Sequence, residues 1–212
     1  MIELLDCTLR DGGYINNWRF NEEFIDKFTT TMDTVIQYVE IGFINKTNKY
    51  RHQLVGKSRM LDLEQISSFS KYKFKKVVMA DFNDIDLDML NQKLDVDLVR
   101  IAFHKHDLCD ALEMCKQIHD KGYKVSVNAM AITNYSNSEL EVLVEFINKH
   151  NLDILYIADS YGSLHQKDIR KYVELFDSKL NTKCRIGFHL HNNMNNAYGN
   201  YEYLKNISKS LE

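Results

Sequence analysis

Short apolar segments rich in β-branched residues alternate with longer amphipathic segments from one end of the chain to the other. The short segments have the length and composition of buried strands, and the longer ones carry apolar residues at helical spacing. The pattern predicts seven strands, at Ile2–Leu9, Ile36–Phe43, Lys76–Ala80, Asp97–Phe103, Tyr123–Ala129, Asp153–Ala158 and Cys184–His191.

Helices are predicted between these strands. The first begins near Asn21, where Phe24, Ile25 and Phe28 share one face. The chain contains no proline, so glycine and capping residues must mark the boundaries. The clearest later helices are expected at Leu108–Lys121, Ser138–His150, Gln166–Ser178 and Met194–Ser208.

Strict alternation of strand and helix predicts a parallel sheet, in a closed barrel or a doubly wound fold. Polar residues suited to catalysis follow several different strands, which favours the mouth of a barrel, and the glycine-rich dinucleotide fingerprint is absent from the sequence. We therefore predict an α/β fold of the TIM (β/α)8 type, with residues 1–212 as one catalytic domain. Only seven βα units are visible, so we expect this chain to lack the eighth, as a truncated one would.

The composition fits that fold and narrows the partners. The 212 residues are 44% hydrophobic and 27% charged, with a formal net charge of -3 and scattered basic residues. We therefore expect a small-molecule substrate, with no nucleic-acid partner and no membrane partner. The four cysteines form no C-x-x-C pair and the N-terminus has no targeting pattern, so a reducing, cytoplasmic location is expected.

The strongest local signal is Gly187-Phe-His-Leu-His-Asn-Asn193 at the end of the last predicted strand. Because strand side chains alternate, His189 and His191 face the same side and can share one divalent cation. Two histidines bonded to loop backbone would fit this motif equally well.

A second signal is Leu5-Asp-Cys-Thr-Leu-Arg-Asp-Gly-Gly-Tyr14. Arg10 is permanently charged and can polarise a carbonyl or hold a carboxylate, and Asp11 offers a hard oxygen ligand. A surface ion pair followed by a glycine turn is the plainer interpretation. The H-x-H motif at another strand end favours the functional one.

Three spaced motifs resemble the DRE-TIM metallolyases. They are Thr8-Leu-Arg-Asp-Gly after strand 1, Val39-Glu40 at the end of strand 2 and His189-x-His191-Asn192 at strand 7. That superfamily includes 4-hydroxy-2-oxovalerate aldolases, HMG-CoA lyases and the homocitrate and isopropylmalate synthases. The resemblance runs through nearly the whole chain and is specific for the superfamily, much less so for the substrate.

The resemblance implies a metal site and an enolate chemistry. Asp11, His189 and His191 would bind Mn²⁺ or Mg²⁺ rather than Zn²⁺, Arg10 would stabilise an enolate, and Glu40 would orient Arg10 and the metal site. One carboxylate and two imidazoles leave about three positions of an octahedral ion for a 2-oxo acid and water. We expect a metal-dependent carbon–carbon lyase of the aldolase type that acts on a 2-oxo acid through a pyruvate-like enolate.

The residue that transfers the proton is less well defined. The bacterial hydroxy-oxovalerate aldolases carry a histidine near the position of Tyr14, and a tyrosine with a reference pKa of ~10 is a poor base near neutrality unless the metal or Arg10 lowers that pKa. His104 resembles a histidine that lines the site in these aldolases; contact with solvent alone explains it equally well.

Three more residues are predicted substrate contacts, each with a plainer alternative. Asn128, at the end of strand 5, otherwise caps a loop. Asp159 resembles the family's Asp-[Ser/Thr]-x-Gly turn and would support the site, although an ordinary turn explains it nearly as well. His52, in a long loop, is either part of a mobile lid or only solvated.

Two other functions stay open on the sequence alone. One is an acyl-CoA-dependent lyase or synthase of the same superfamily. The other is a catalytically incomplete barrel that acts through protein contacts. Seven strands leave two exposed edges, which a homo-oligomer would cover.

Overall fold

The computed structural model of the protein describes residues 2–46 and 55–208. These residues form two compact units, which we describe separately. The N-terminal unit comprises residues 3–46, 55–100 and 121–123, and the C-terminal unit comprises residue 2, residues 101–120 and residues 124–208. His52 lies outside the described residues.

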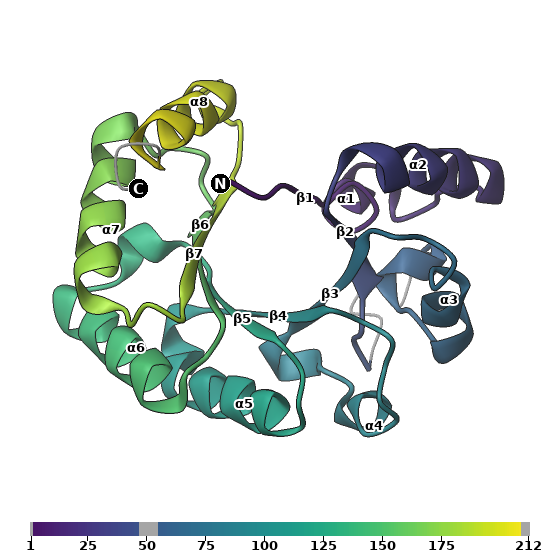
Figure 1. Ribbon diagram of the computed structural model, residues 1–212, viewed down its shortest axis with the longest axis horizontal. Helices are drawn as coiled ribbons and strands as arrows, with labels where there is room; N and C mark the ends of the chain where they lie inside the picture. The colour runs from purple at the N-terminus through teal and green to yellow at the C-terminus, as the bar shows by residue number, and fades with distance from the viewer. Residues whose placement is uncertain (1, 47–54, 209–212) are drawn as a thin grey trace. The chain divides into compact units, whose positions relative to one another are not determined.

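The strands of the N-terminal unit follow the chain order β1-β2-β3-β4. β1 pairs with β2 and β2 with β3, both in parallel, and the pairing of β2 with β3 shifts register between Glu40 and Gly42. α2 and α3 lie on the same side of β2 and β3 (Figure 1). The elements are β1 (Leu5–Asp6), α1 (Gly13–Asn16), α2 (Glu22–Val35), β2 (Tyr38–Phe43), η1 (Lys57–Arg59), α3 (Leu63–Ser68), β3 (Lys75–Asp81), η2 (Phe82–Asp84), α4 (Leu87–Leu90) and β4 (Leu98–Phe103), which runs on into the C-terminal unit after Arg100.

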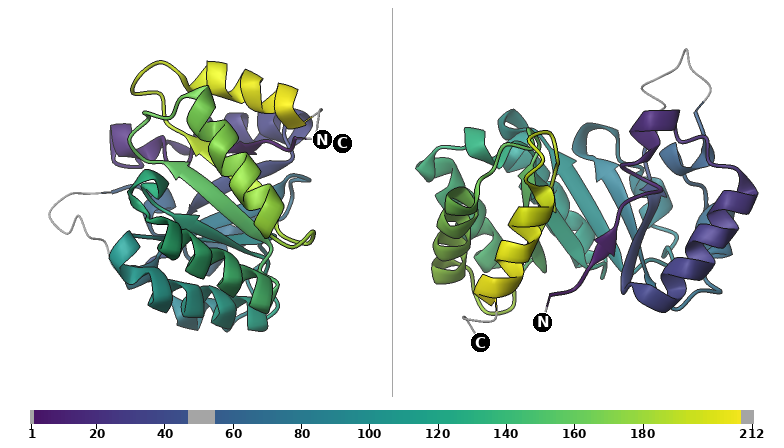
Figure 2. Two further views of the ribbon diagram at one scale, coloured as in Figure 1. Left: turned by 90° about the vertical axis from the view of Figure 1, so that its left-hand side faces the viewer. Right: turned by 90° about the horizontal axis from the view of Figure 1, so that it is seen from above.

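The C-terminal unit continues the alternation, with the strand order β4-β5-β6-β7. β5 pairs with β6 and β6 with β7 in parallel, without a register shift. α5, α6 and α7 all lie on one side of these strands (Figure 1), and α7 lies beside α8 (Figure 2), where Arg170 Nε donates to Tyr203 Oη at 2.8 Å. The elements are η3 (Lys105–Asp107), α5 (Leu108–Asp120), β5 (Val125–Ala129), η4 (Ile132–Asn134), α6 (Asn137–His150), β6 (Ile154–Asp159), α7 (Gln166–Lys179), β7 (Arg185–Leu190) and α8 (Ala197–Ser208).

The two faces of the strands differ in chemistry. The face toward the helices is aliphatic: Leu155 and Ile157 of β6 are fully buried, as are Leu112 of α5 and Ile147 of α6. The other face carries buried polar groups, among them Glu40, Arg100, Ser126 and Asn128. Because successive strand residues point to opposite sides, one sequence supplies both an apolar core and a polar interior.

Local sequence explains most boundaries. Asn21 caps α2 by accepting from the Phe24 N–H at 2.7 Å, as its place before an apolar stripe predicts. Ser136 and Glu139 form a capping box that starts α6. The later helices begin and end within about three residues of the predicted positions.

The first strand is much shorter than predicted. Only Leu5–Asp6 pair as β1, because the Asp6 carboxylate accepts from the Thr8 N–H at 2.8 Å and from the Thr8 hydroxyl at 3.2 Å, which turns the chain early. The placement of Glu40 at the end of strand 2 was also wrong, since β2 continues through Ile41, Gly42 and Phe43. In the part of the chain that the structure describes, no helix combines the length and apolar character of a membrane span.

Candidate functional site

The turn after β1 places Arg10 and Asp11. The backbone N–H groups of both residues donate to the Cys7 carbonyl, at 3.1 and 2.7 Å. The Arg10 side chain points back toward Glu40 of β2. The Arg10 backbone carbonyl accepts from the Trp18 indole N–H at 2.6 Å. Hydrogen bonds to the backbone of Arg10 and Asp11 therefore hold the turn in one conformation and set where these two side chains begin.

Gly12 and Gly13 are required by close packing. A Cβ at Gly12 would lie 2.5 Å from the Thr8 carbonyl oxygen, and a Cβ at Gly13 would overlap the Trp18 ring. Trp18 is buried and itself has a φ of 57°, an unusual conformation for a bulky residue. The double glycine thus allows Trp18 to pack directly against the turn that carries Arg10.

The guanidinium of Arg10 belongs to a buried charge network, the Arg10–Glu40–Arg100 network. Arg10 Nε donates to Glu40 Oε2 at 2.6 Å, and Arg100 Nη1 donates to Glu40 Oε1 at 2.9 Å. Arg10 Nη1 also donates to Asp11 Oδ1 at 2.6 Å. One buried carboxylate thereby holds two guanidinium groups, and the first of them binds Asp11.

Electrostatics fixes the protonation states within this network. Burial lowers the pKa of Arg10, but the interactions with Glu40, Cys7 and Asp11 together outweigh burial, so the net pKa is raised and Arg10 stays charged. Loss of hydration, then repulsion from Glu40, raises the pKa of the Cys7 thiol to about 12. Arg100 Nη1 donates to Cys7 Sγ at 3.7 Å. Cys7 is therefore a neutral thiol beside two fixed positive charges.

Sequence reasoning missed Arg100. Its signal is a single charged residue in the apolar strand Leu98-Val-Arg-Ile-Ala-Phe103, where a charge is buried only if it is paired. It also missed Arg59, whose guanidinium carbon lies 4.2 Å from the centre of the Phe43 ring and whose Nη2 lies 3.3 Å from Asp81 Oδ2. Arg10 approaches the same ring at 5.7 Å.

In the C-terminal unit the structure brings His189 and His191 together, as the H-x-H spacing predicts. Their ring centres are 4.8 Å apart with an interplanar angle of 86°, and a nitrogen of one ring lies within 4.8 Å of a nitrogen of the other. His191 Nδ1 lies 2.8 Å from the Asp159 carbonyl oxygen, which only accepts. The carbonyl therefore requires a proton on Nδ1, which in the neutral tautomer makes Nε2 the nitrogen that can coordinate a metal.

Asp159 supports this arrangement through its loop. It is the last residue of β6, and its buried carboxylate accepts from the backbone N–H groups of Ser163 at 3.0 Å and Leu164 at 3.2 Å. The side chain thus shapes the loop, and the carbonyl orients His191. The predicted supporting role agrees with these contacts better than direct substrate contact does.

The other predicted residues have less defined surroundings. Tyr14 is 53% exposed and meets the Trp18 ring edge-on, with 4.7 Å between ring centres. His104 follows β4 directly, is exposed and stacks on His106 at 5.6 Å. Asn128 is buried in β5, with its Oδ1 3.4 Å from the Ser126 hydroxyl.

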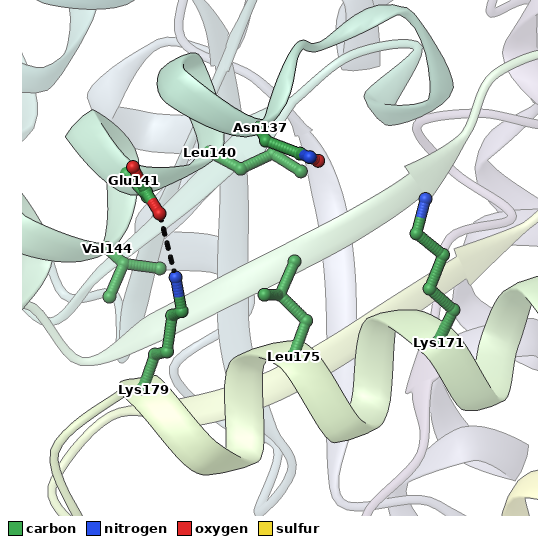
Figure 3. Close-up of a pocket in the computed structure, with 7 residues that line it drawn as sticks. All are labelled: Asn137, Leu140, Glu141, Val144, Lys171, Leu175 and Lys179. Atoms are coloured by element: carbon green, nitrogen blue, oxygen red, sulfur yellow. Dashed lines mark hydrogen bonds and ion pairs between the residues drawn. The ribbon is translucent and has the colours of Figure 1, made fainter.

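The donor groups of each unit suit a divalent ion. In the C-terminal unit, the imidazoles of His189 and His191 are ligands of the kind that Mn²⁺ and related ions accept. In the N-terminal unit, the Asp11 carboxylate has enough lone pairs to accept from Arg10 and still coordinate an ion. A small hollow of about 220 Å³ lies elsewhere, between α6 and α7 (Figure 3). The Glu141–Lys179 ion pair crosses it at 3.0 Å, and none of the predicted site residues lines it.

Comparison with known proteins gives the class. Residues 1–203 match the HMGL-like family, so the chain belongs to that family. A solved N-terminal domain described as that of an aldolase from Bacteroides vulgatus is 27% identical, with a TM-score of 0.86 over 97% of this chain and 70% of that one. The DRE-TIM resemblance and the α/β fold of the TIM-barrel type, both predicted from the sequence, are confirmed.

Among curated proteins, 4-hydroxy-2-oxovalerate aldolase from Bacillus cereus is similar to this chain. The two are 22% identical over 204 residues, 94% of this chain and 59% of that protein. Oxaloacetate decarboxylase from Mycobacterium tuberculosis is 24% identical over 203 residues, 93% of this chain and 59% of that protein. The chain thus spans about three fifths of the length of these relatives.

Proposed function

We propose that this protein is a divalent-metal-dependent carbon–carbon lyase of the aldolase type, acting on a 2-oxo acid through a pyruvate-like enolate. One observation carries the proposal. The Arg10 guanidinium is fixed by buried Glu40 at 2.6 Å and bonded to Asp11 at 2.6 Å, so a permanent positive charge stands beside a hard oxygen ligand.

The relatives support the reaction class. 4-Hydroxy-2-oxovalerate and oxaloacetate are both 2-oxo acids with a bond between C3 and C4 whose cleavage leaves a pyruvate enolate. In the aldol case a base removes the proton from the C4 hydroxyl, the C3–C4 bond breaks, and its electron pair forms the enolate while an aldehyde departs. A proton then adds to C3 to give pyruvate.

In this proposal each residue has one task. Asp11, His189 and His191 hold the ion, and the Asp159 carbonyl keeps the His191 proton on Nδ1. A bound divalent ion would supply Lewis acidity toward the ketone. Arg10 stabilises the negative charge that develops on the enolate oxygen, because its guanidinium is already oriented before the charge forms.

Proton transfer and substrate contact are assigned from the sequence. Tyr14 and His104 are the candidates for the proton-transfer residue, and Asn128 and His52 for contacts to the substrate. Tyr14 is exposed, as a residue at the opening of a site would be. Comparing Tyr14→Phe with His104→Ala in the experiment below tests which of the two transfers the proton at C3, because exchange into the methyl group of pyruvate measures that step.

The test is deuterium exchange into the methyl group of pyruvate, followed by proton NMR, with Mn²⁺, with Mg²⁺ and after chelation. It needs only enolisation, so the identity of the aldehyde does not matter. We expect exchange that requires the ion and is lost in Arg10→Ala. A folded wild-type protein that binds Mn²⁺ and exchanges no pyruvate would refute the proposal.

A further inference from the structure

The aromatic side chain of Tyr156 lies on the strand face that carries His189. In the β6–β7 pairing Ala158 is opposite His189 and Tyr156 is opposite Gly187, and Asn128 of β5 is opposite Tyr156. Residues two apart on a strand share a face, so Tyr156, Gly187 and His189 are on the same one. The alternation of burial agrees, since Leu155 and Ile157 are fully buried on the other face.

Tyr156 occupies the space that a side chain on Gly187 would fill. A Cβ at Gly187 would lie 2.7 Å from Tyr156 Cε1 and 2.8 Å from Cζ. Such contacts are shorter than carbon atoms tolerate, so glycine here allows the ring to lean across β7. The half-buried ring therefore covers the position directly before His189 on the same face.

The depth of this position follows from strand geometry. Each residue advances a parallel strand by ~3.3 Å, so the layer of Tyr156 and Gly187 lies ~7 Å from that of His189. It lies on the N-terminal side, which is the deeper side because sites in such folds open at the C-terminal ends of the strands. The Tyr156 ring thus forms a floor, one side-chain layer deeper than His189.

We propose that Tyr156, seated against Gly187, is a specificity-determining residue that limits the substrate to a 2-oxo acid with a short chain. This inference rests on the proposed function. A bulky aromatic ring at this depth leaves room for the one-carbon chain of pyruvate and excludes longer chains. Hydrophobic floors discriminate by about 10–200-fold per methylene group.

The experiment compares pyruvate with 2-oxobutanoate, which is longer by one methylene group. Two readouts are used: deuterium exchange at C3, and dissociation constants from water-proton relaxation of the Mn²⁺-loaded protein. In wild type both should favour pyruvate. In Tyr156→Ala the ratio of 2-oxobutanoate to pyruvate should rise at least tenfold in both readouts, because the floor is gone.

Further variants keep the test decisive if Tyr156→Ala does not fold. Tyr156→Val is smaller and suits a strand, and it should shift the ratio in the same direction. Tyr156→Phe keeps the ring and should keep the wild-type ratio. Gly187→Ala should push the Tyr156 ring toward His189. It should therefore weaken the binding of both acids, and that of 2-oxobutanoate more. Tyr203→Ala, at the contact of α7 with α8, is the matched control and should leave the ratio unchanged.

The two proposals fail in different ways. If wild type neither exchanges nor binds either acid while it holds Mn²⁺, the proposed function is refuted and the size limit with it. If wild type exchanges pyruvate, and folded Tyr156→Ala and Tyr156→Val both keep the wild-type ratio within about twofold, the floor is refuted and the lyase proposal stands.

Discussion

The two units hold their functional side chains in opposite ways. In the N-terminal unit, the side chains of Arg10, Glu40 and Arg100 are 8%, 0% and 1% exposed and are joined by charge-assisted bonds. In the C-terminal unit, His189 and His191 are half-buried, and a backbone carbonyl orients the second of them. The N-terminal unit fixes charged side chains by burying them together, and the C-terminal unit orients the ring of His191 with a backbone carbonyl.

The difference follows from the cost of burial. A buried ion must be paired and hydrogen-bonded, so a network of charges has to be complete before the fold is stable. A neutral imidazole carries no such penalty and needs only the correct tautomer and orientation. We therefore expect substitutions in the N-terminal unit to affect folding and chemistry together, and those at the histidines to affect metal binding alone.

Glu40→Gln should produce the largest effect. It removes the one negative charge that both guanidinium groups share, and breaking a buried ion pair costs about 3–5 kcal/mol. Urea unfolding followed by circular dichroism measures this loss. Glu141→Gln is the matched control, because its ion pair with Lys179 is exposed and should cost less than about 1 kcal/mol. Equal losses in the two variants would contradict the buried network.

Arg10→Lys should come next. Lysine keeps the charge but lacks the planar fork that binds Glu40 and Asp11 at once, so the charge is no longer held in place. Pyruvate exchange should fall by about 100–1,000-fold, the usual loss when one oriented donor to a developing oxyanion is removed. Arg19→Lys, an exposed surface change, is the control. Near-wild-type exchange in Arg10→Lys would show that charge alone suffices.

The sequence predicted those elements that a local apolar pattern is enough to define. The helix expected at Leu108–Lys121 forms as Leu108–Asp120. Its apolar stripe can be buried against the sheet without any particular side-chain partner, so the local pattern is sufficient to predict it. The first strand failed because the bonds between Asp6 and Thr8 compete with pairing, which an apolar pattern does not reveal. Interior elements could thus be predicted closely, and polar turns could not.

The site divides along the same line. The proximity of His189 and His191 is predicted by a period of two, although β7 ends at Leu190 and His191 follows it directly, where the predicted strand ran to His191. The pairing of Glu40 with Arg100 joins residues 60 apart in the chain, and no local pattern encodes that partnership. The Tyr156 ring over Gly187 was missed for the same reason, since only the β6–β7 register brings the two residues together.

Substitution of the histidines should have a smaller effect on a different property. His189→Ala and His191→Ala should weaken Mn²⁺ binding at least about 10–100-fold, the loss expected even when only a supporting contact is removed. The free energy of unfolding without metal should change by less than about 1 kcal/mol, because the rings are only half-buried. Mn²⁺ titration followed by electron paramagnetic resonance, with urea unfolding, measures both.

A matched control exists in the same unit. His104 and His106 form a second H-x-H motif after a strand, but their rings are exposed and stacked, with an interplanar angle of 11° instead of 86°. His106→Ala should leave Mn²⁺ affinity as in wild type. If it weakens binding as much as His191→Ala does, the ion is held elsewhere and the contrast between the two units loses its functional meaning.

The smallest effect should appear at Cys7 and depend on pH. The folded state raises the thiol pKa from 9.0 to about 12, so the stability from the neutral thiol is complete below pH 9 and is lost as pH rises toward 12. Between pH 8 and pH 10 the unfolded thiol ionises while the folded thiol keeps its proton, which costs wild type about 1 kcal/mol. Cys7→Ser and Cys7→Ala have no thiol to ionise, so their free energy of unfolding should not show this loss.

Urea unfolding at pH 8 and at pH 10 measures the change in the free energy of unfolding for each protein. If wild type and both variants lost stability in parallel, the thiol would be hydrated, and the charge network beside it would be more open than its contacts imply.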